Sequence, residues 1–250
     1  MLEITSTENQ LIKHIRKLSL HTYRKKCGET VLEGERLVND CIRFGGEIIT
    51  VLVREGYTGR IPTANKVYVT SPKIFDSLCE TTTPQGILAI ASAKMNKVAD
   101  IAKGGLVIIC DRVQDPGNLG TIFRTAHAVG ADGVILLKGS ADPFSLKTVR
   151  SSMGSCFALS LAETDEMPAI SGYTAFCGTL SEKTVSLYET DFPNKTMLVL
   201  GNEANGASEK VISACEKHIK IPMPGGAESL NVAAAGAIMM YEYFRQVHYV

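Results

Sequence analysis

Three stretches of the sequence gather polar side chains and glycines, and each directly follows an apolar run typical of a β-strand. They are DRVQDPGNLGTIFRTA from residue 111, GNEANGAS from residue 201 and PMPGGAESLNVA from residue 222. In a parallel sheet, the loops that leave the carboxyl ends of the strands lie along one edge. The pattern therefore predicts one composite site, formed by Asn118, Arg124, Glu203, Ser229 and Asn231.

The third stretch ends where a helix rich in small residues is expected to begin. The first turn of a helix has unpaired backbone N–H groups, and Gly225 and Gly226 let the backbone approach a ligand closely. A second interpretation is an ordinary turn before a helix that Ser229 caps. That interpretation is the better one for this stretch alone, whereas the two other loops favour a binding site.

Arg124 is the residue of the first stretch best suited to bind an anion. It follows Asn118 by six residues, roughly 9 Å along a helix axis, so the two side chains are expected to flank a bound group. The planar, permanently charged guanidinium suits phosphate. The alternative is an ion pair inside the protein, with Glu203 as the partner.

Several classes of enzyme and site are not supported by the sequence. The motifs GxGxxG, GxxxxGK[ST], GxSxG and HExxH are absent. The seven cysteines are scattered without a CxxC pair, and no histidines have metal-ligand spacing, so we expect no metal and no disulfide framework. This cysteine usage favours a cytoplasmic setting. No signal peptide and no apolar run of membrane-spanning length is found, so no membrane association is expected.

Apolar periodicity divides the chain into two α/β domains, assigned to residues 1–95 and 104–250. The first is expected to contain a helix over residues 7–20 and strands at EIITVLVRE, KVYVT and GILAIAS. A polar linker is placed at residues 93–103. The second domain is expected to form a parallel sheet from GLVIICD, DGVILL, GYTAFCGTL, TMLVLGNE and HIKIPM.

Charge is unevenly distributed, although the formal net charge is zero. Residues 1–97 hold 14 Lys and Arg against 10 Asp and Glu, whereas residues 98–250 hold 12 against 16. The basic residues of the first domain predict a surface that contacts the phosphates of a polyanion, and the alternative is a set of ordinary solvated helix faces. The residues expected to contact phosphate are Lys13, Arg16, Lys17, Arg24, Lys25, Lys26 and Arg36.

The three polar stretches together resemble the three motifs of the SpoU family, RNA ribose 2'-O-methyltransferases of the SPOUT superfamily. The resemblance covers residues 106–246 in order, spacing and residue type. The matching positions are Asn118-Leu119-Gly120, Arg124, Ala126 and Gly130, then Gly201-Asn202-Glu203, Gly206 and Ser208, then Ile221-Pro222-Met223, Gly225 and Glu228 to Val232. Two positions depart from the pattern, since Ala204 replaces a usual glycine and Ala207 a usual leucine.

The resemblance implies a fold, a cofactor and residue roles. The second domain would be a parallel-sheet SPOUT domain whose C-terminal segment forms a trefoil knot. S-adenosylmethionine would be bound by Gly178, Thr179, Gly201, Ile221, Met223 and Leu230. Arg124 would be the main catalytic residue, and the residues that hold it, the ribose and the knot loops would be Asn118, Glu203, Ser229 and Asn231.

The resemblance also implies partners. The stretches RKKCGETVLEGERLV and TTPQGILAI resemble the ribosomal-protein-like α/β RNA-binding domain of rRNA-directed members. That domain, and the absence of a helical extension after Gln246, favour 23S rRNA over tRNA as the expected substrate. Arg150 is expected to contact RNA or a dimer partner, and the C-terminal domain is expected to form a homodimer. A tRNA methyltransferase, a non-catalytic RNA-binding or ribosome-assembly factor and, more distantly, a nicotinamide oxidoreductase remain as alternatives.

Overall fold

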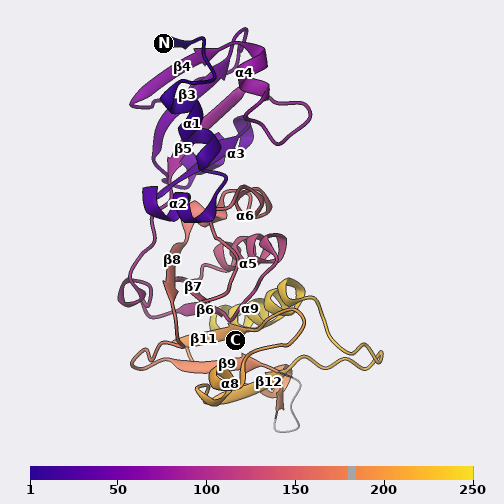
Figure 1. The fold of residues 1–250 in the computed structure, drawn as a ribbon. Coiled ribbons are helices and arrows are strands. Elements are labelled where there is room, and N and C mark those ends of the chain that lie inside the picture. The colour runs from indigo at the N-terminus through magenta and orange to yellow at the C-terminus, as the bar shows by residue number, and fades with distance from the viewer. Residues whose placement is uncertain (180–183, 250) are drawn as a thin grey trace. The chain divides into compact units, whose positions relative to one another are not determined.

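The computed structural model describes residues 1–179 and 184–249, which fold into two compact units (Figure 1). Unit 1 comprises Met1–Lys94 and Phe144–Ala158. Unit 2 comprises Met95–Pro143 and Leu159–Val250. Both units have α/β architecture, as the alternation of strand and helix patterns predicts.

Unit 1 is built on a five-stranded mixed sheet. In spatial order its strands are β1 (Leu2–Ile4), β4 (Lys66–Thr70), β3 (Ile48–Arg54), β5 (Ile87–Ser92) and β2 (Glu29–Glu33). The first three run parallel, and β5 is antiparallel to both β3 and β2. The helices of the N-terminal part are α1 (Gln10–Lys17), α2 (His21–Cys27), α3 (Glu35–Arg43) and α4 (Pro72–Asp76).

The first helix is shorter than the apolar pattern predicts. It begins after Asn9, whose side chain accepts a hydrogen bond from the N–H of Leu11, and it ends at Lys17. Its apolar face buries Ile12 and Ile15 in a core with Phe75 of α4 and Leu88 of β5. The basic residues of α1 consequently lie on its other faces.

Residues 144–158 differ from the expected domain assignment, because they pack within unit 1. They form α6 (Leu146–Ser151) and α7 (Ser155–Ala158). The hydroxyl of Thr30 donates a hydrogen bond of 2.7 Å to the carbonyl of Phe144. Arg150 forms ion pairs with Glu33 at 2.6 Å and Glu80 at 3.2 Å. Contacts between residues far apart in the sequence decide this placement, and the local apolar periodicity does not predict such contacts.

Unit 2 is built on a seven-stranded sheet in which every neighbouring pair of strands is parallel. In spatial order the strands are β10 (Val185–Ser186), β12 (Lys217–Lys220), β9 (Thr174–Gly178), β11 (Thr196–Leu200), β6 (Leu106–Cys110), β7 (Gly133–Leu137) and β8 (Ser160–Thr164). The expected parallel sheet is confirmed. The strand patterns missed β8 and β10, and Leu180, the last residue of one expected strand, lies outside the described residues.

Helices cover both faces of this sheet, which explains why all residues of β6, β7 and β11 are buried. One face packs against α8 (Glu209–Ser213) and residues near the short helix η1 (Val98–Asp100). The other face lies against α5 (Pro116–Ala128) and α9 (Val232–Tyr249), which pack on each other (Figure 1). A second short helix, η2 (Leu187–Glu189), contacts α9. No helix in the described ranges is long and apolar enough to cross a membrane.

We predict that Arg150→Ala lowers the free energy of unfolding of unit 1 by about 2 kcal/mol. The substitution leaves the carboxylate of Glu33, whose side chain is only 3% exposed, without its cation. Urea unfolding provides the measurement. Arg36→Ala is the control, because Arg36 is 77% exposed and lies 4.0 Å from Asp40, so its removal is expected to cost less than about 0.5 kcal/mol. Equal losses for the two variants would contradict this account of α6.

Candidate ligand-binding and catalytic site

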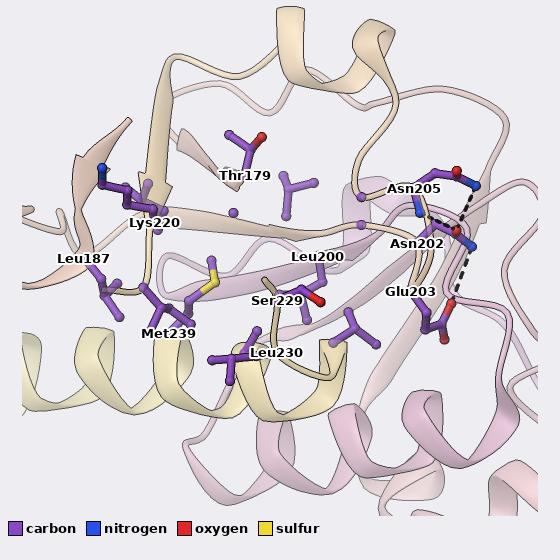
Figure 2. Close-up of a pocket in the computed structure, with 18 of the residues that line it drawn as sticks. Thr179, Leu187, Leu200, Asn202, Glu203, Asn205, Lys220, Ser229, Leu230 and Met239 are labelled. Carbon is purple, nitrogen blue, oxygen red and sulfur yellow. Dashed lines mark hydrogen bonds between the residues drawn. The ribbon is translucent and has the colours of Figure 1, made fainter. Parts of the chain in front are cut away.

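A pocket of about 430 Å³ lies at the carboxyl ends of β9, β11 and β12 (Figure 2). Its walls come from the loops that follow these strands, and α9 contributes Val232, Ala235 and Met239. The six residues expected to bind a cofactor all line it, namely Gly178, Thr179, Gly201, Ile221, Met223 and Leu230. Glu203 and Ser229 line it as well. Parallel strand topology thus brings together residues from three separate loops.

The loop after β11 is held in a tight turn. The N–H and carbonyl of Asn202 both bond to Gly206, at 3.0 and 2.9 Å, and the Asn202 side-chain oxygen accepts from the N–H groups of Ala204 and Asn205 at 3.1 Å. Gly201 enters this turn with no room for a side chain, because an added Cβ would collide with the backbone of Gly206 and Ala207. The turn therefore requires glycine at position 201, which also lines the pocket.

Two buried polar residues anchor the same loop, namely Asn202, a matching position of the second motif, and Asp111, which the sequence analysis did not single out. Asp111 is 3% exposed, and its carboxylate accepts from the N–H of Ser208 at 2.6 Å and from Arg112 Nε at 3.1 Å. The side-chain amide of Asn202 donates to the carbonyl of Arg112 at 2.9 Å. The available signal was position, because Asp111 is the first polar residue after the buried strand LVIIC.

A chain of hydrogen bonds joins the three polar loops. Asn118 donates from its amide nitrogen to Glu203 at 3.0 Å, and Asn231 donates in the same way to the amide oxygen of Asn118 at 3.0 Å. Glu203 also accepts from the N–H groups of Gln114 and Asp115, at 3.2 and 3.1 Å. Because an ionised carboxylate only accepts, it fixes the orientation of the Asn118 amide. The expected convergence of these three side chains is observed.

The cap of α9 differs from the simpler sequence interpretation. Asn231, and not Ser229, caps the helix, since its side-chain oxygen accepts from the N–H groups of Ala233 and Ala234 at 2.9 and 3.3 Å. Ser229 is exposed and lies at the pocket wall (Figure 2). Asn231 consequently links the cap of α9 to Asn118 on α5.

Opposing effects set the pKa of Glu203. Partial burial raises it, but hydrogen bonds from Asn118 and from the backbone N–H groups outweigh burial and bring the pKa below the ordinary glutamate value of 4.5. Glu203 is therefore a carboxylate at neutral pH, and it lies at the end of the pocket formed by the loop after β11 (Figure 2).

Arg124 lies on α5 with Asn118, and its side chain is exposed. Over residues 1–179 and 184–249 the side chain of Arg124 forms no hydrogen bond or ion pair, so the structure does not contain the alternative pair with Glu203. Asp115 starts α5 as its cap and accepts from the N–H of Asn118 at 2.8 Å. Arg124 does not line the pocket, yet its helix is fixed to the pocket wall through Asn118.

The basic residues expected to contact phosphate in unit 1 fall into different environments. The exposed ones are Arg16, Lys17, Lys25, Lys26 and Arg36. Lys13 is half-buried and pairs with Glu8 at 2.7 Å. Arg24 is only 8% exposed and donates to the carbonyl of Leu18 at 2.6 Å, so we leave it out of the phosphate-contacting set. The guanidinium of Arg150 is already paired with the carboxylates of Glu33 and Glu80.

No cluster of metal-ligating side chains occurs in the part of the chain that the structure describes. The cysteines are all free, and most are buried. The pocket itself offers amides, the carboxylate of Glu203, the hydroxyls of Thr179 and Ser229 and the ammonium group of Lys220, and the guanidinium of Arg124 lies on α5.

Comparison with known proteins finds a matching family model in both units. Residues 105–241 match the SpoU rRNA Methylase family, and residues 9–89 match the MRM3-like substrate binding domain. The 23S rRNA (guanosine(2553)-2'-O)-methyltransferase RlmP of Bacillus subtilis is 36% identical over 96% of this chain and 98% of its own length.

Solved structures agree over nearly the whole chain. An AdoMet-bound rRNA methyltransferase from Sinorhizobium meliloti is 30% identical and has a TM-score of 0.84, covering 99% of this chain and 98% of its own. The SpoU methyltransferase AviRb from Streptomyces viridochromogenes, in complex with AdoMet, is 26% identical with a TM-score of 0.83, covering 96% of this chain and 98% of its own.

We predict that the stability advantage of the parent protein over Glu203→Gln depends on pH. Folding lowers the pKa of Glu203 below its ordinary value of 4.5. The ionised carboxylate therefore stabilises the fold fully above pH 4.5, and this contribution is lost as the pH falls through the folded-state pKa. Urea unfolding of both proteins across that range measures the difference. A difference that stays constant with pH would show that the carboxylate does not hold the loops together.

Proposed function

The chain belongs to the SpoU rRNA methylase family, and on that premise we propose that it methylates a ribose 2'-hydroxyl of 23S rRNA with S-adenosylmethionine. One observation carries the proposal. Residues from the ends of β9, β11 and β12 form a single pocket, beside a hydrogen-bonded Glu203, Asn118 and Asn231 and a helix that presents an exposed arginine.

The pocket fits the proposed cofactor in size and character. Its volume of about 430 Å³ is in the range of small-molecule sites. Ile221, Met223 and Leu230 supply apolar surface for a purine ring, and Gly201 lies in the same pocket lining. Gly178 and Thr179 complete the set that would hold the cofactor. When bound, S-adenosylmethionine supplies an electrophilic methyl group on a sulfonium.

The residues of the chain would position the ribose for attack on the methyl group and would not themselves form a bond to it. A ribose hydroxyl is a weak nucleophile at neutral pH, so holding it in line with the methyl group carries much of the rate. Arg124 would bind the adjoining phosphate and favour loss of the hydroxyl proton. Asn118, fixed between Glu203 and Asn231, would set the position of the arginine-bearing helix, and Ser229 would contact the ribose.

The choice of substrate rests on unit 1. Residues 9–89 match a substrate-binding domain, and a relative that is 36% identical and aligned over 98% of its own length is named for 23S rRNA. Both observations favour rRNA over tRNA. A non-catalytic RNA-binding or assembly factor is a weaker alternative, because Arg124, Asn118 and the pocket are all present.

We also propose a trefoil knot, a dimer and a cytoplasmic setting. The segment between β12 and α9 would be the threaded one, since it contributes both to the pocket and to the cap of α9. A homodimer through α9 is supported by its exposed Tyr241, at 52%, and the exposed small residue Ala234 beside the cap. The free cysteines suit a reducing compartment.

The direct test is transfer of labelled methyl groups to separate pools of unmodified 23S rRNA and tRNA. Label in 23S rRNA is expected. Label in tRNA alone would overturn the substrate, and binding of both cofactor and rRNA without transfer to rRNA or ribosomal particles would favour the non-catalytic alternative.

We predict that Arg124→Ala lowers the rate of methyl transfer by about 10²- to 10³-fold, because it removes the charge that positions the phosphate. The dissociation constant for S-adenosylmethionine is expected to stay unchanged, since Arg124 does not line the pocket. Lys138→Ala removes another exposed cation of unit 2 and serves as the control. Transfer by Arg124→Ala at the parent rate would refute the catalytic role.

We predict that Lys25→Glu together with Lys26→Glu weakens RNA binding and flattens its dependence on salt. Both side chains are exposed at the end of α2, where reversing their charge repels phosphate. Filter binding over a series of salt concentrations gives the measurement. Unchanged affinity at low salt would remove this cluster from the RNA-binding surface.

A further inference from the structure

A second hollow, of about 420 Å³, lies in unit 1, and none of its lining residues is among those assigned so far. It is formed by the end of α3, the start of β3 and the loop between β3 and β4. Its lining residues are Asn39, Ile42, Arg43, Gly46, Ile48, Arg60, Pro62 and Thr63. Its size is within the range of small-molecule sites, so it has room for one nucleotide.

The hollow carries two exposed arginines that no carboxylate neutralises. Arg43 and Arg60 form no ion pair within residues 1–179 and 184–249. Two other arginines of unit 1 are paired, Arg54 with Asp76 at 3.2 Å and Arg150 with Glu33 at 2.6 Å. Two unpaired guanidinium groups at one concave surface attract a phosphate-bearing ligand.

The structure fixes the backbone around Arg60. The hydroxyl of Tyr57 donates to Glu35 at 2.9 Å and lies 3.4 Å from the carbonyl oxygen of Arg60. Burial and the neighbouring Glu35 raise the pKa of Tyr57 to about 12, so the hydroxyl remains a donor. Gly59 packs so closely against Tyr57 and Glu35 that a Cβ there would collide with both side chains. The loop that carries Arg60 is thus pinned to α3.

The remaining surface is suited to a base. Ile42 is 43% exposed although it is a large apolar residue, and Pro62 lies in the same hollow. The guanidinium of Arg43 lies 5.6 Å from the ring centre of Phe44, which restricts its position. Proteins that read single-stranded RNA combine apolar or planar surfaces for unstacked bases with cations for the backbone.

We propose that this hollow binds an unstacked nucleotide of the RNA substrate, with Arg43 and Arg60 on its phosphates and Ile42 and Pro62 against its base. The inference rests on the proposed function, because it takes RNA as the ligand. It adds a contact site distinct from the cations of α1 and α2, and it assigns unit 1 a part in selecting RNA with an unpaired segment.

The test uses the full chain with Arg43→Gln and Arg60→Gln combined. Affinity for an unmodified 23S rRNA transcript is expected to fall roughly tenfold. In a plot of the logarithm of the binding constant against the logarithm of the salt concentration, the magnitude of the slope is expected to fall by about 1.4, the value for two single-strand phosphate contacts. The KM for RNA is expected to rise, with kcat and the affinity for S-adenosylmethionine unchanged. Lys73→Gln with Lys195→Gln, two other exposed cations, is the matched control and is expected to leave all these values unchanged.

Cross-linking gives a second readout that does not depend on a substitution. A transcript containing 4-thiouridine is expected to cross-link to peptides spanning residues 39–48 or 60–63. Parent-like affinity and salt slope in the double variant would overturn the proposal, and so would cross-linked peptides that all lie elsewhere. If the parent protein neither binds nor methylates RNA, the proposed function itself fails, and that outcome is distinguishable because it precedes any comparison of variants.

Discussion

The hydrogen-bonded chain from Glu203 through Asn118 to Asn231 is the interaction on which the site depends. It links residues 85 and 113 positions apart in the sequence, and it holds the end of β11, the start of α5 and the start of α9 together. The donor and acceptor roles of the groups in these two hydrogen bonds are determined. Glu203 is ionised and can only accept, so Asn118 must donate to it and accept from Asn231. A hydrogen bond to a charged group is stronger than one between neutral groups, which favours this arrangement of the three loops.

The parallel sheet makes this series of hydrogen bonds possible, and the convergence of the three loops was predictable from the sequence. Buried strands followed by polar, glycine-containing loops imply that the loops share one edge, and Asn118, Glu203 and Asn231 do meet there. The two departures from the usual motif are also accommodated. Ala204 donates its backbone N–H to the side-chain oxygen of Asn202 without a positive φ, so this position does not require the backbone freedom of glycine, and Ala207 is buried in the core.

What the sequence did not predict depends on contacts between distant residues. Arg24 and Arg150 belong to basic stretches, yet the first turns inward to a backbone carbonyl and the second pairs with a buried carboxylate. The placement of residues 144–158 in unit 1 follows from such contacts as well. Asp111 gave a weak signal, since its burial and its bond to Ser208 appear only when β6 and the loop after β11 are neighbours. Local pattern determines elements, and burial determines which charged side chains remain available.

The methyl group is expected on a ribose oxygen, and the position of the label in the product shows whether it lies there. After transfer from labelled S-adenosylmethionine, the 23S rRNA would be hydrolysed with alkali and the resistant dinucleotides digested to nucleosides. The account predicts that the label lies in an alkali-resistant dinucleotide and then in a single 2'-O-methylnucleoside. Label in a base-methylated nucleoside, with no resistant linkage, would contradict it.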